Sequence, residues 1–222
     1  MVGIPVNRIR NIRSDQPVPG DSTGSDPHRL SGDRVGCRGR DVVALVGSLR
    51  ADSWNRRLMM RAEELAPTTI RLSVVGVADV PLFDEDLEHT PPPGVVALDA
   101  RLSRADAVVV AGPEYNLGLS GVAKNTLDWL SRPVLEGPLM FKPCAVVCAS
   151  TSRAEPVRAA AQARTTLEAC GASVMPPPDL VIRSIGRRVD DEGRFTEVVT
   201  DPLEEFLGRF ATFLDDIARP AG

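Results

Sequence analysis

Short apolar runs alternate with amphipathic segments along most of the chain. The apolar runs are rich in Val, Ala and Ile and are bounded by Gly, Pro or polar residues, which is typical of buried strands. They cover residues 41–47, 70–77, 107–111, 143–149 and 174–182, and prolines at 176–178 interrupt the last. Apolar residues at helical spacing predict helices over residues 54–66, 94–103, 121–131, 157–170 and 202–218.

Strands that alternate with helices predict a parallel sheet with helices on both faces. Such a succession of units matches a flavodoxin-like α/β fold, a three-layer sandwich with a five-stranded parallel sheet in the order 2-1-3-4-5. Ligands of such sheets bind beyond the carboxyl ends of the strands. We therefore predict one domain over residues 41–222 and look for chemistry in the loops that follow its strands.

Residues 1–40 have a different composition. They are rich in Gly, Pro, Ser, Asp and Arg, have few apolar residues, and carry seven arginines against four aspartates. Such a segment buries too little surface to offset its ordering entropy. We predict a disordered basic N-terminal extension, with a partner-binding arm or an upstream, misassigned start codon as alternatives.

Charge and composition narrow the class of protein. A net charge of −4 with no basic stripe argues against nucleic acid as a partner. No apolar run is long enough to span a membrane, and no secretory h-region follows the N-terminal arginines, so we expect a cytoplasmic protein. The four cysteines show no metal-ligand spacing, and we expect core thiols, with a redox pair of Cys144 and Cys148 as the alternative.

The first strand runs directly into a polar segment, G-S-L-R-A-D-S-W-N at residues 47–55. The hydroxyls of Ser48 and Ser53, the Arg50 guanidinium, the Asn55 amide and free N–H groups at the helix start could converge on one phosphate. The segment is neither a Walker loop nor a dinucleotide-binding G-x-G-x-x-G motif. The alternative is an ordinary strand–helix turn with a serine cap.

Two further loops follow the third and fourth strands. After Gly112 the chain continues as Pro113, Glu114, Tyr115 and Asn116, and Tyr115 is the only tyrosine of the protein. A tyrosine ring offers a flat wall for a heterocycle, and the loop backbone offers hydrogen bonds along its rim. A tight turn with a surface tyrosine is the alternative. The loop at residues 150–156 follows the next strand, so we expect it beside this one.

Two segments of the chain, with a third between them, carry a resemblance to a known family. They are GSLRADSWNRRL and AGPEYNLGLSGVAKNTLDWLSR, and VPLFDEDLE lies between them. Together they resemble the NADPH-dependent FMN reductase family, which includes quinone, chromate and azo-dye reductases. Order and spacing agree over residues 41–183. The resemblance implies a flavodoxin-like fold with non-covalent FMN. It places the phosphate on Ser48, Arg50, Ser53 and Asn55 and the backbone N–H of Trp54, and the flavin ring against Pro113, Glu114, Tyr115 and Asn116, with Ser150 approaching from the third loop.

The resemblance also implies roles for other residues and one departure. Lys124, Asn125 and Asp128 match the family, and we interpret them as positioning the loop and helix, or alternatively as subunit contacts. Glu155 and Pro156 stand where similar proteins carry a Gly-Gly pair. We expect this change to bear on the nicotinamide pocket, the choice of acceptor and the flavin affinity, because proline lacks an N–H and glutamate adds a charge.

The function that we predict is an FMN-dependent NAD(P)H oxidoreductase. NADPH or NADH would give two electrons, as a hydride, to the flavin, and a quinone, flavin or similar acceptor would then take them. The flavin carries the chemistry, so no catalytic side chain and no metal is expected. We expect His28 and His89 to be solvated, and Glu85, Asp86 and Glu88 to form an acidic rim.

The resemblance further implies a homodimer or homotetramer in which a neighbour helps to close the flavin pocket. Two alternatives to the reductase remain open. One is a non-enzymatic flavoprotein that acts as an electron carrier or redox-responsive binding module. The other is a phosphate-binding hydrolase or transferase without flavin, although no nucleophile elbow or Ser-His-Asp set is visible.

Overall fold

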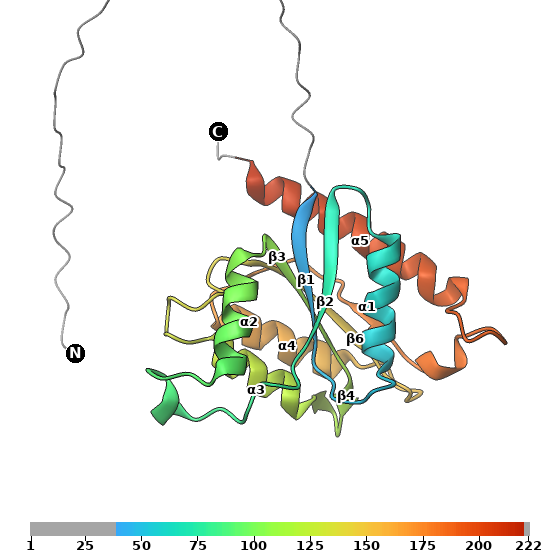
Figure 1. Cartoon of the computed structure of the whole chain (residues 1–222). Helices are drawn as coiled ribbons and strands as arrows, with labels where there is room; N and C mark the ends of the chain where they lie inside the picture. The colour runs from blue at the N-terminus through green and yellow to red at the C-terminus, as the bar shows by residue number, and fades with distance from the viewer. Residues whose placement is uncertain (1–38, 220–222) are drawn as a thin grey trace, which may run out of the picture. The chain divides into compact units, whose positions relative to one another are not determined.

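The computed structural model describes residues 39–219, so the prediction for residues 1–40 lies almost entirely outside the described part. Its main sheet is parallel and has the order β2-β1-β3-β6-β7, with β8 also pairing with β6 (Figure 1). The strands are β1 (Arg40–Val46), β2 (Ile70–Gly76), β3 (Ala107–Gly112), β6 (Pro143–Ala149), β7 (Ser173–Val174) and β8 (Leu180–Ile182). This confirms the predicted order 2-1-3-4-5, with the fifth strand divided by its prolines.

Helices cover both faces of the sheet (Figure 1). On one face lie α1 (Trp54–Leu65) and α5 (Glu197–Ala218), and on the other lie α2 (Pro93–Arg104), α3 (Gly121–Leu130) and α4 (Val157–Ala169). Two short 3-10 helices, η1 (Glu85–Leu87) and η2 (Ile185–Arg187), lie in the connections. The predicted three-layer α/β sandwich is therefore confirmed.

The alternating side chains of β1 show how the sheet divides the core. Val42, Ala44 and Val46 pack with the helices α1 and α5, whereas Val43 and Leu45 pack with α2, α3 and α4. All five are buried. Because successive strand residues point to opposite faces and both faces are covered, the strand is apolar throughout instead of alternating with polar residues.

The start of α5 differs from the prediction. The helix begins at Glu197, five residues before the expected start at Pro202, which now lies inside it. A proline in a helix removes one backbone hydrogen bond, and this favoured Pro202 as the first residue. Val199 and Leu203, one turn apart, are both fully buried, so core packing of this face stabilises the additional turn.

A second difference is a small hairpin that the sequence pattern does not predict. Strands β4 (Glu114–Tyr115) and β5 (Gly118–Leu119) pair antiparallel directly after β3. Two-residue strands carry no measurable period, so nothing in the hydrophobic pattern distinguishes them from a loop. The hairpin places Tyr115 at the carboxyl edge of the main sheet.

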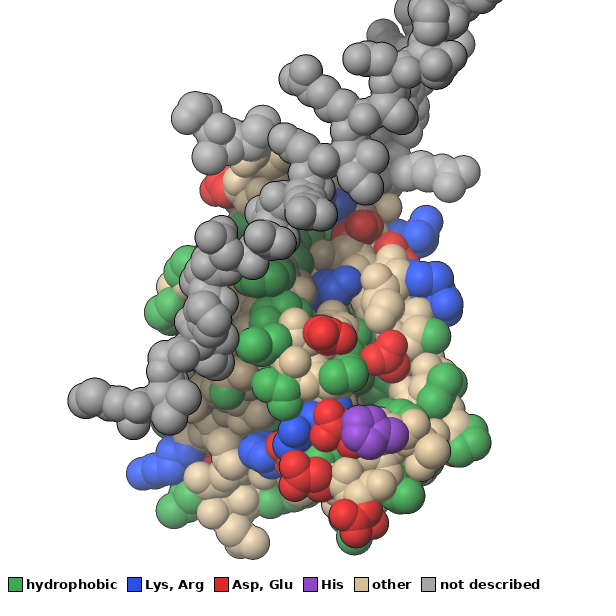
Figure 2. Space-filling view, turned by 90° about the vertical axis from the view of Figure 1, so that its left-hand side faces the viewer, with side chains coloured by type: hydrophobic (Ala, Val, Ile, Leu, Met, Phe, Trp, Pro, Cys, Tyr) green, Lys and Arg blue, Asp and Glu red, His purple; other side chains and the backbone are tan. Residues whose placement is uncertain are grey.

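The long connection between β2 and α2 carries the residues that we predicted to form an acidic rim. Glu85, Asp86 and His89 are exposed, as expected for a solvated rim. Glu88 differs, because it is half-buried and forms an ion pair with Arg132 at 3.6 Å. Figure 2 shows the side of the molecule on which acidic and apolar side chains intermingle.

Within residues 39–219 no group of three His, Cys, Asp or Glu side chains could hold a metal ion. No helix of this part of the chain is long and apolar enough to cross a membrane.

Cys144 and Cys148 are core thiols on the face of β6 that packs against α2, α3 and α4. Both are fully buried. Four residues along a strand span roughly 13 Å, too far for a disulfide. Burial raises the pKa of the Cys148 thiol to about 12 and raises that of Cys144 further. The redox-pair alternative is therefore wrong.

We predict that neither thiol reacts with iodoacetamide in the folded protein. The thiolate is the nucleophile, and burial with a raised pKa removes both access and ionisation. Peptide mass spectrometry after labelling at mildly alkaline pH should show residues 144 and 148 unmodified in the native protein and alkylated after unfolding in guanidinium. Labelling of the native protein at the rate of a free cysteine would contradict this.

Candidate functional site

A cavity of about 290 Å³ lies at the carboxyl edge of the sheet, among the loops that follow β1, β3 and β6. All the predicted site residues except Asn116 line it. Ala149, Thr151 and Ser152, which the sequence analysis did not single out, also contribute. The run of three hydroxyl residues after β6 was the available signal for the last two. The full lining set is Ser48, Arg50, Ser53, Trp54, Asn55, Pro113, Glu114, Tyr115, Ala149, Ser150, Thr151 and Ser152.

The first loop presents donors at the start of α1. Ser53 is the N-cap residue, and its Oγ accepts a hydrogen bond from the N–H of Arg56 at 3.3 Å. The N–H groups of Trp54 and Asn55, in the uncapped part of the first turn, have no acceptor among residues 39–219. The exposed Arg50 guanidinium likewise has no partner in this part of the chain. Unpaired N–H groups and a cation at a helix start are the kind of groups that favour an anion.

Asn55 has a different role from the one that we expected for its amide. Its Nδ2 donates to the Ala149 carbonyl at 3.0 Å, and its Oδ1 accepts from the Ala149 N–H at 3.0 Å. Both partners are buried. The side chain therefore joins the first turn of α1 to the end of β6. It sets the distance between the first and third loops instead of pointing its amide at a ligand.

The start of α3 packs directly against the first loop. The Ser120 hydroxyl donates to the Gly47 carbonyl at 2.6 Å. A Cβ on Gly47 would lie 2.3 Å from the Cβ of Ala123, so only glycine allows this close approach. The contact places the second loop, which leads into α3, beside the first.

The hairpin β4–β5 carries Tyr115 and explains the position of Asn116. Asn116 and Leu117 form its two-residue turn with φ values of 51° and 64°. Positive φ at both central residues is the type I′ geometry, which asparagine tolerates well and leucine does not. Asn116 therefore shapes the turn outside the cavity, while Tyr115, 50% exposed, borders it.

Tyr115 also lines a second, adjoining cavity of about 440 Å³. This cavity shares Ser48 and Arg50 with the first one and is otherwise lined by Leu49, Ser120, Gly121 and Val122. The tyrosine ring thus stands between a polar recess and a more open, apolar one. A planar ligand with a charged end fits such a pair of adjoining cavities.

Glu114 caps helix α4 across the site. Its Oε2 accepts hydrogen bonds from the N–H groups of Arg158 and Ala159, both at 3.0 Å. The N-cap residue of this helix is Pro156, which has no side-chain capping group. A carboxylate at a helix N-terminus also interacts favourably with the helix dipole. Glu114 therefore joins the second loop to the helix that follows the third.

The third loop is fixed at its start, and its residues 151–155 are exposed. The Ser150 N–H donates to the Ile182 carbonyl at 2.9 Å, and its Oγ accepts from the Ser152 N–H at 3.1 Å. Glu155, which occupies one of the two positions where similar proteins carry glycine, is exposed. Its carboxylate forms no hydrogen bond or ion pair with residues 39–219, and it does not line the cavity.

The residues that we interpreted as positioning groups on α3 anchor the connection after β2. The Asn125 Oδ1 accepts from the Phe83 N–H at 2.7 Å, and its Nδ2 donates to the Pro81 carbonyl at 2.8 Å. Lys124 and Asp128 form an ion pair at 2.5 Å on the same helix. The positioning role of Asn125 is thus visible in its contacts.

The site combines an anion-binding helix start, a cation, a flat aromatic wall and a hydroxyl-rich rim. The donor set suits a phosphate joined to a planar heterocycle, and FMN is such a group. Among residues 39–219, Glu114 is the one carboxylate that lines the cavity, and it accepts hydrogen bonds from backbone N–H groups. The fold and site therefore define a flavodoxin-like protein that binds a phosphorylated planar cofactor.

The chain belongs to the NADPH-dependent FMN reductase family, whose model matches residues 40–186. It is 32% identical to a quinone reductase of Pseudomonas putida over 174 residues, covering 78% of this chain and 94% of the relative. It is 34% identical to an NAD(P)H-dependent FMN reductase of Pseudomonas aeruginosa over 157 residues, covering 70% and 84%.

Among solved structures, the flavoenzyme NAD(P)H:(acceptor) oxidoreductase FerB of Paracoccus denitrificans superimposes with a TM-score of 0.69 at 30% identity, covering 80% of this chain and 98% of FerB. The protein is therefore an NAD(P)H-dependent oxidoreductase with FMN as cofactor. The predicted family, fold, enzyme class and cofactor are confirmed. The electron-carrier and hydrolase alternatives lose their basis.

We predict that Glu114→Ala destabilises the apo protein by about 1 kcal/mol, the typical cost of losing a helix cap. Glu114→Gln should lose less, because its amide oxygen still accepts hydrogen bonds. Urea unfolding of the FMN-free protein, followed by circular dichroism, measures both.

Glu155→Ala is the matched control, because it removes a nearby exposed carboxylate that has no partner in the described chain. Its effect should stay within about 0.5 kcal/mol. Equal unfolding midpoints for Glu114→Ala and Glu155→Ala would show that Glu114 does not stabilise α4.

Proposed function

We propose that FMN binds in the cavity among the first, second and third loops and passes two electrons from NADPH or NADH to a quinone, a flavin or a similar acceptor. The observation that carries this proposal is the convergence of Ser48, Arg50, Ser53 and the free N–H groups of α1 on the cavity that Tyr115 borders. The relatives named quinone reductases support the choice of acceptor.

The first loop would hold the phosphate. The hydroxyls of Ser48 and Ser53 and the N–H groups of Trp54 and Asn55 are donors held in place by the fold. Arg50 adds a charge that no described carboxylate neutralises. Hydrogen bonds between charged groups are stronger than neutral ones, so the phosphate end would contribute much of the affinity.

The second and third loops would orient the ring. Pro113 and Tyr115 offer its wall, and Ser150, Thr151 and Ser152 offer polar groups along its rim. FMN, when bound, supplies the hydride chemistry, and the chain supplies binding and orientation. Because Glu114 is held by two backbone N–H groups, we assign it no proton-transfer role.

A second copy of this chain would cover the open side of the site. Leu49, Tyr115 and Leu117 are all exposed beside it. Leu117 is 63% exposed and has positive φ, a conformation that is unfavourable for leucine. An exposed apolar side chain held in a strained turn suits a protein contact, which supports the expected homodimer or homotetramer.

A cytoplasmic location is part of the proposal. The nicotinamide co-substrate of the family is an intracellular metabolite, and the buried thiols Cys144 and Cys148 are unpaired. Unpaired thiols are typical of proteins in reducing compartments.

We predict that the purified protein shows the absorption bands of FMN and oxidises NADPH or NADH when menadione is supplied. Arg50→Ala should weaken FMN binding by roughly 10- to 100-fold, because a hydrogen bond to a charged group contributes about 1.5–3 kcal/mol. Fluorescence titration of the apo protein with FMN measures the dissociation constant.

Arg104→Ala, which removes an exposed arginine at the last turn of α2, is the control and should bind FMN as the wild type does. A flavin-bound protein with no turnover on either nicotinamide would contradict the reductase proposal. An Arg50→Ala variant with wild-type affinity would contradict the phosphate assignment alone.

We predict that Leu117→Gly weakens self-association without destabilising the monomer. Glycine adopts positive φ freely, so the substitution removes a local strain of about 1 kcal/mol together with the apolar contact. Sedimentation velocity over a range of protein concentrations should show dissociation at higher concentration than for the wild type.

Leu82→Ala is the matched control, since Leu82 is also exposed but does not line either cavity of the site. It should leave the sedimentation coefficient unchanged. A wild-type protein that stays monomeric at every concentration would show the oligomer proposal to be wrong.

A further inference from the structure

The side chain of Trp54, the first residue of α1, is contacted by one residue of its own helix and by two residues from late in the chain. The Arg57 guanidinium carbon lies 4.4 Å from the centroid of the indole ring. The Phe195 ring centroid lies 6.1 Å away, with the two rings tilted by 53°. The Gly186 backbone approaches so closely that a Cβ there would lie 3.2 Å from Cζ2 of the indole. The ring of this cavity-lining residue is therefore held from several sides.

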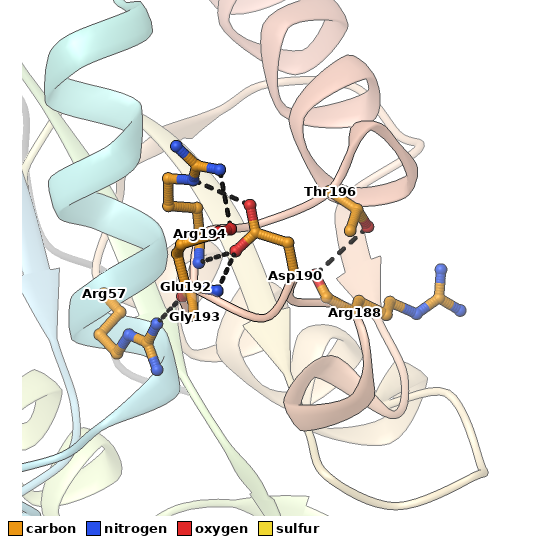
Figure 3. A network of polar contacts seen from close by, with 7 residues as sticks. All are labelled: Arg57, Arg188, Asp190, Glu192, Gly193, Arg194 and Thr196. Atoms are coloured by element: carbon orange, nitrogen blue, oxygen red, sulfur yellow. Dashed lines mark hydrogen bonds and ion pairs between the residues drawn. The ribbon is translucent and has the colours of Figure 1, made fainter.

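Arg57 joins this ring to a turn late in the chain. Its guanidinium donates a hydrogen bond to the Gly193 carbonyl and lies 5.5 Å from the centroid of the Phe195 ring. Figure 3 shows the side chain reaching from α1 to that turn. No carboxylate of residues 39–219 forms an ion pair with Arg57. Its charge is therefore used for stacking on two aromatic rings and for one carbonyl.

The turn is held by a carboxylate at its centre (Figure 3). One Asp190 oxygen accepts from the N–H groups of Glu192 and Arg194 at 3.1 and 2.8 Å, and the other accepts from the Arg194 Nε at 2.8 Å. An antiparallel backbone bridge closes the turn. The carbonyl that binds the guanidinium therefore belongs to an ordered structure.

We propose that Arg57 is a positioning residue for the phosphate end of the FMN site, an inference that rests on the proposed function. By stacking on Trp54 and binding the Gly193 carbonyl, it fixes the first turn of α1, whose free N–H groups we assign to the phosphate. The turn at residues 189–195 is thereby part of the site, although it lies beyond residues 40–186 that match the family model.

The same helix supplies a matched control. Arg61 lies one turn further along α1 and lines the same groove of about 550 Å³ as Arg57, between α1 and the turn. It forms an ion pair with Glu64 at 2.7 Å and stacks on no aromatic ring of residues 39–219. Arg61→Ala therefore removes an arginine from the same surface and leaves the contacts of Trp54 intact.

The test compares Arg57→Ala, Arg57→Lys and Arg61→Ala in a Trp129→Phe background, in which Trp54 is the sole tryptophan. Acrylamide quenching of Trp54 in the apo protein measures how firmly the ring is held. FMN titration measures affinity, and urea unfolding shows that each variant is folded. We expect Arg57→Ala to raise the quenching constant about twofold and the FMN dissociation constant about tenfold.

Arg57→Lys should recover part of both effects, because it keeps a cation over the rings, and Arg61→Ala should match the parent. A folded Arg57→Ala variant with parental FMN affinity, or with unchanged quenching of Trp54, would overturn the inference. A parent protein that binds no FMN would instead overturn the proposed function, while the quenching result would still show whether Arg57 holds the indole.

Discussion

The paired hydrogen bonds between the Asn55 side chain and the Ala149 backbone hold the site together. The parallel sheet brings the ends of β1 and β6 to the same edge, but β3 lies between them, so the two loops share no ladder. Asn55 crosses that gap. Because both of its polar groups are used and buried, the distance between the first and third loops is fixed before any cofactor binds.

Other polar side chains connect the loops in the same way. Glu114 joins the second loop to α4, and the Gln162 Oε1 on that helix accepts from the Leu119 N–H at 2.7 Å. This cross-connection also accounts for the unusual Pro156, because a carboxylate from another loop satisfies the helix start that the proline leaves uncapped. The proline in place of a glycine is thus tolerated structurally, and Glu155 beside it is exposed.

Much of the fold followed from the hydrophobic pattern. The long apolar strands and amphipathic helices are periodic enough to identify, and their alternation indicates a parallel sheet with helices on both faces. The start of α5 and the hairpin β4–β5 did not follow. Buried Val199 and Leu203 outweigh a local signal from Pro202, and the two-residue strands are too short to show any pattern. In both cases contacts that are distant in sequence decide the local structure.

Periodicity and residue types at fixed spacing were enough to predict the fold class, the family and nearly all the residues that line the cavity. The contacts that each of these residues makes became visible only in the folded chain. Asn55 and Glu114 read as ligand-binding groups in the sequence, yet their polar atoms bind backbone groups 94 and 44 residues away. A side chain's partners are set by which backbone groups the fold leaves unsatisfied nearby, and this is known only once the chain is packed.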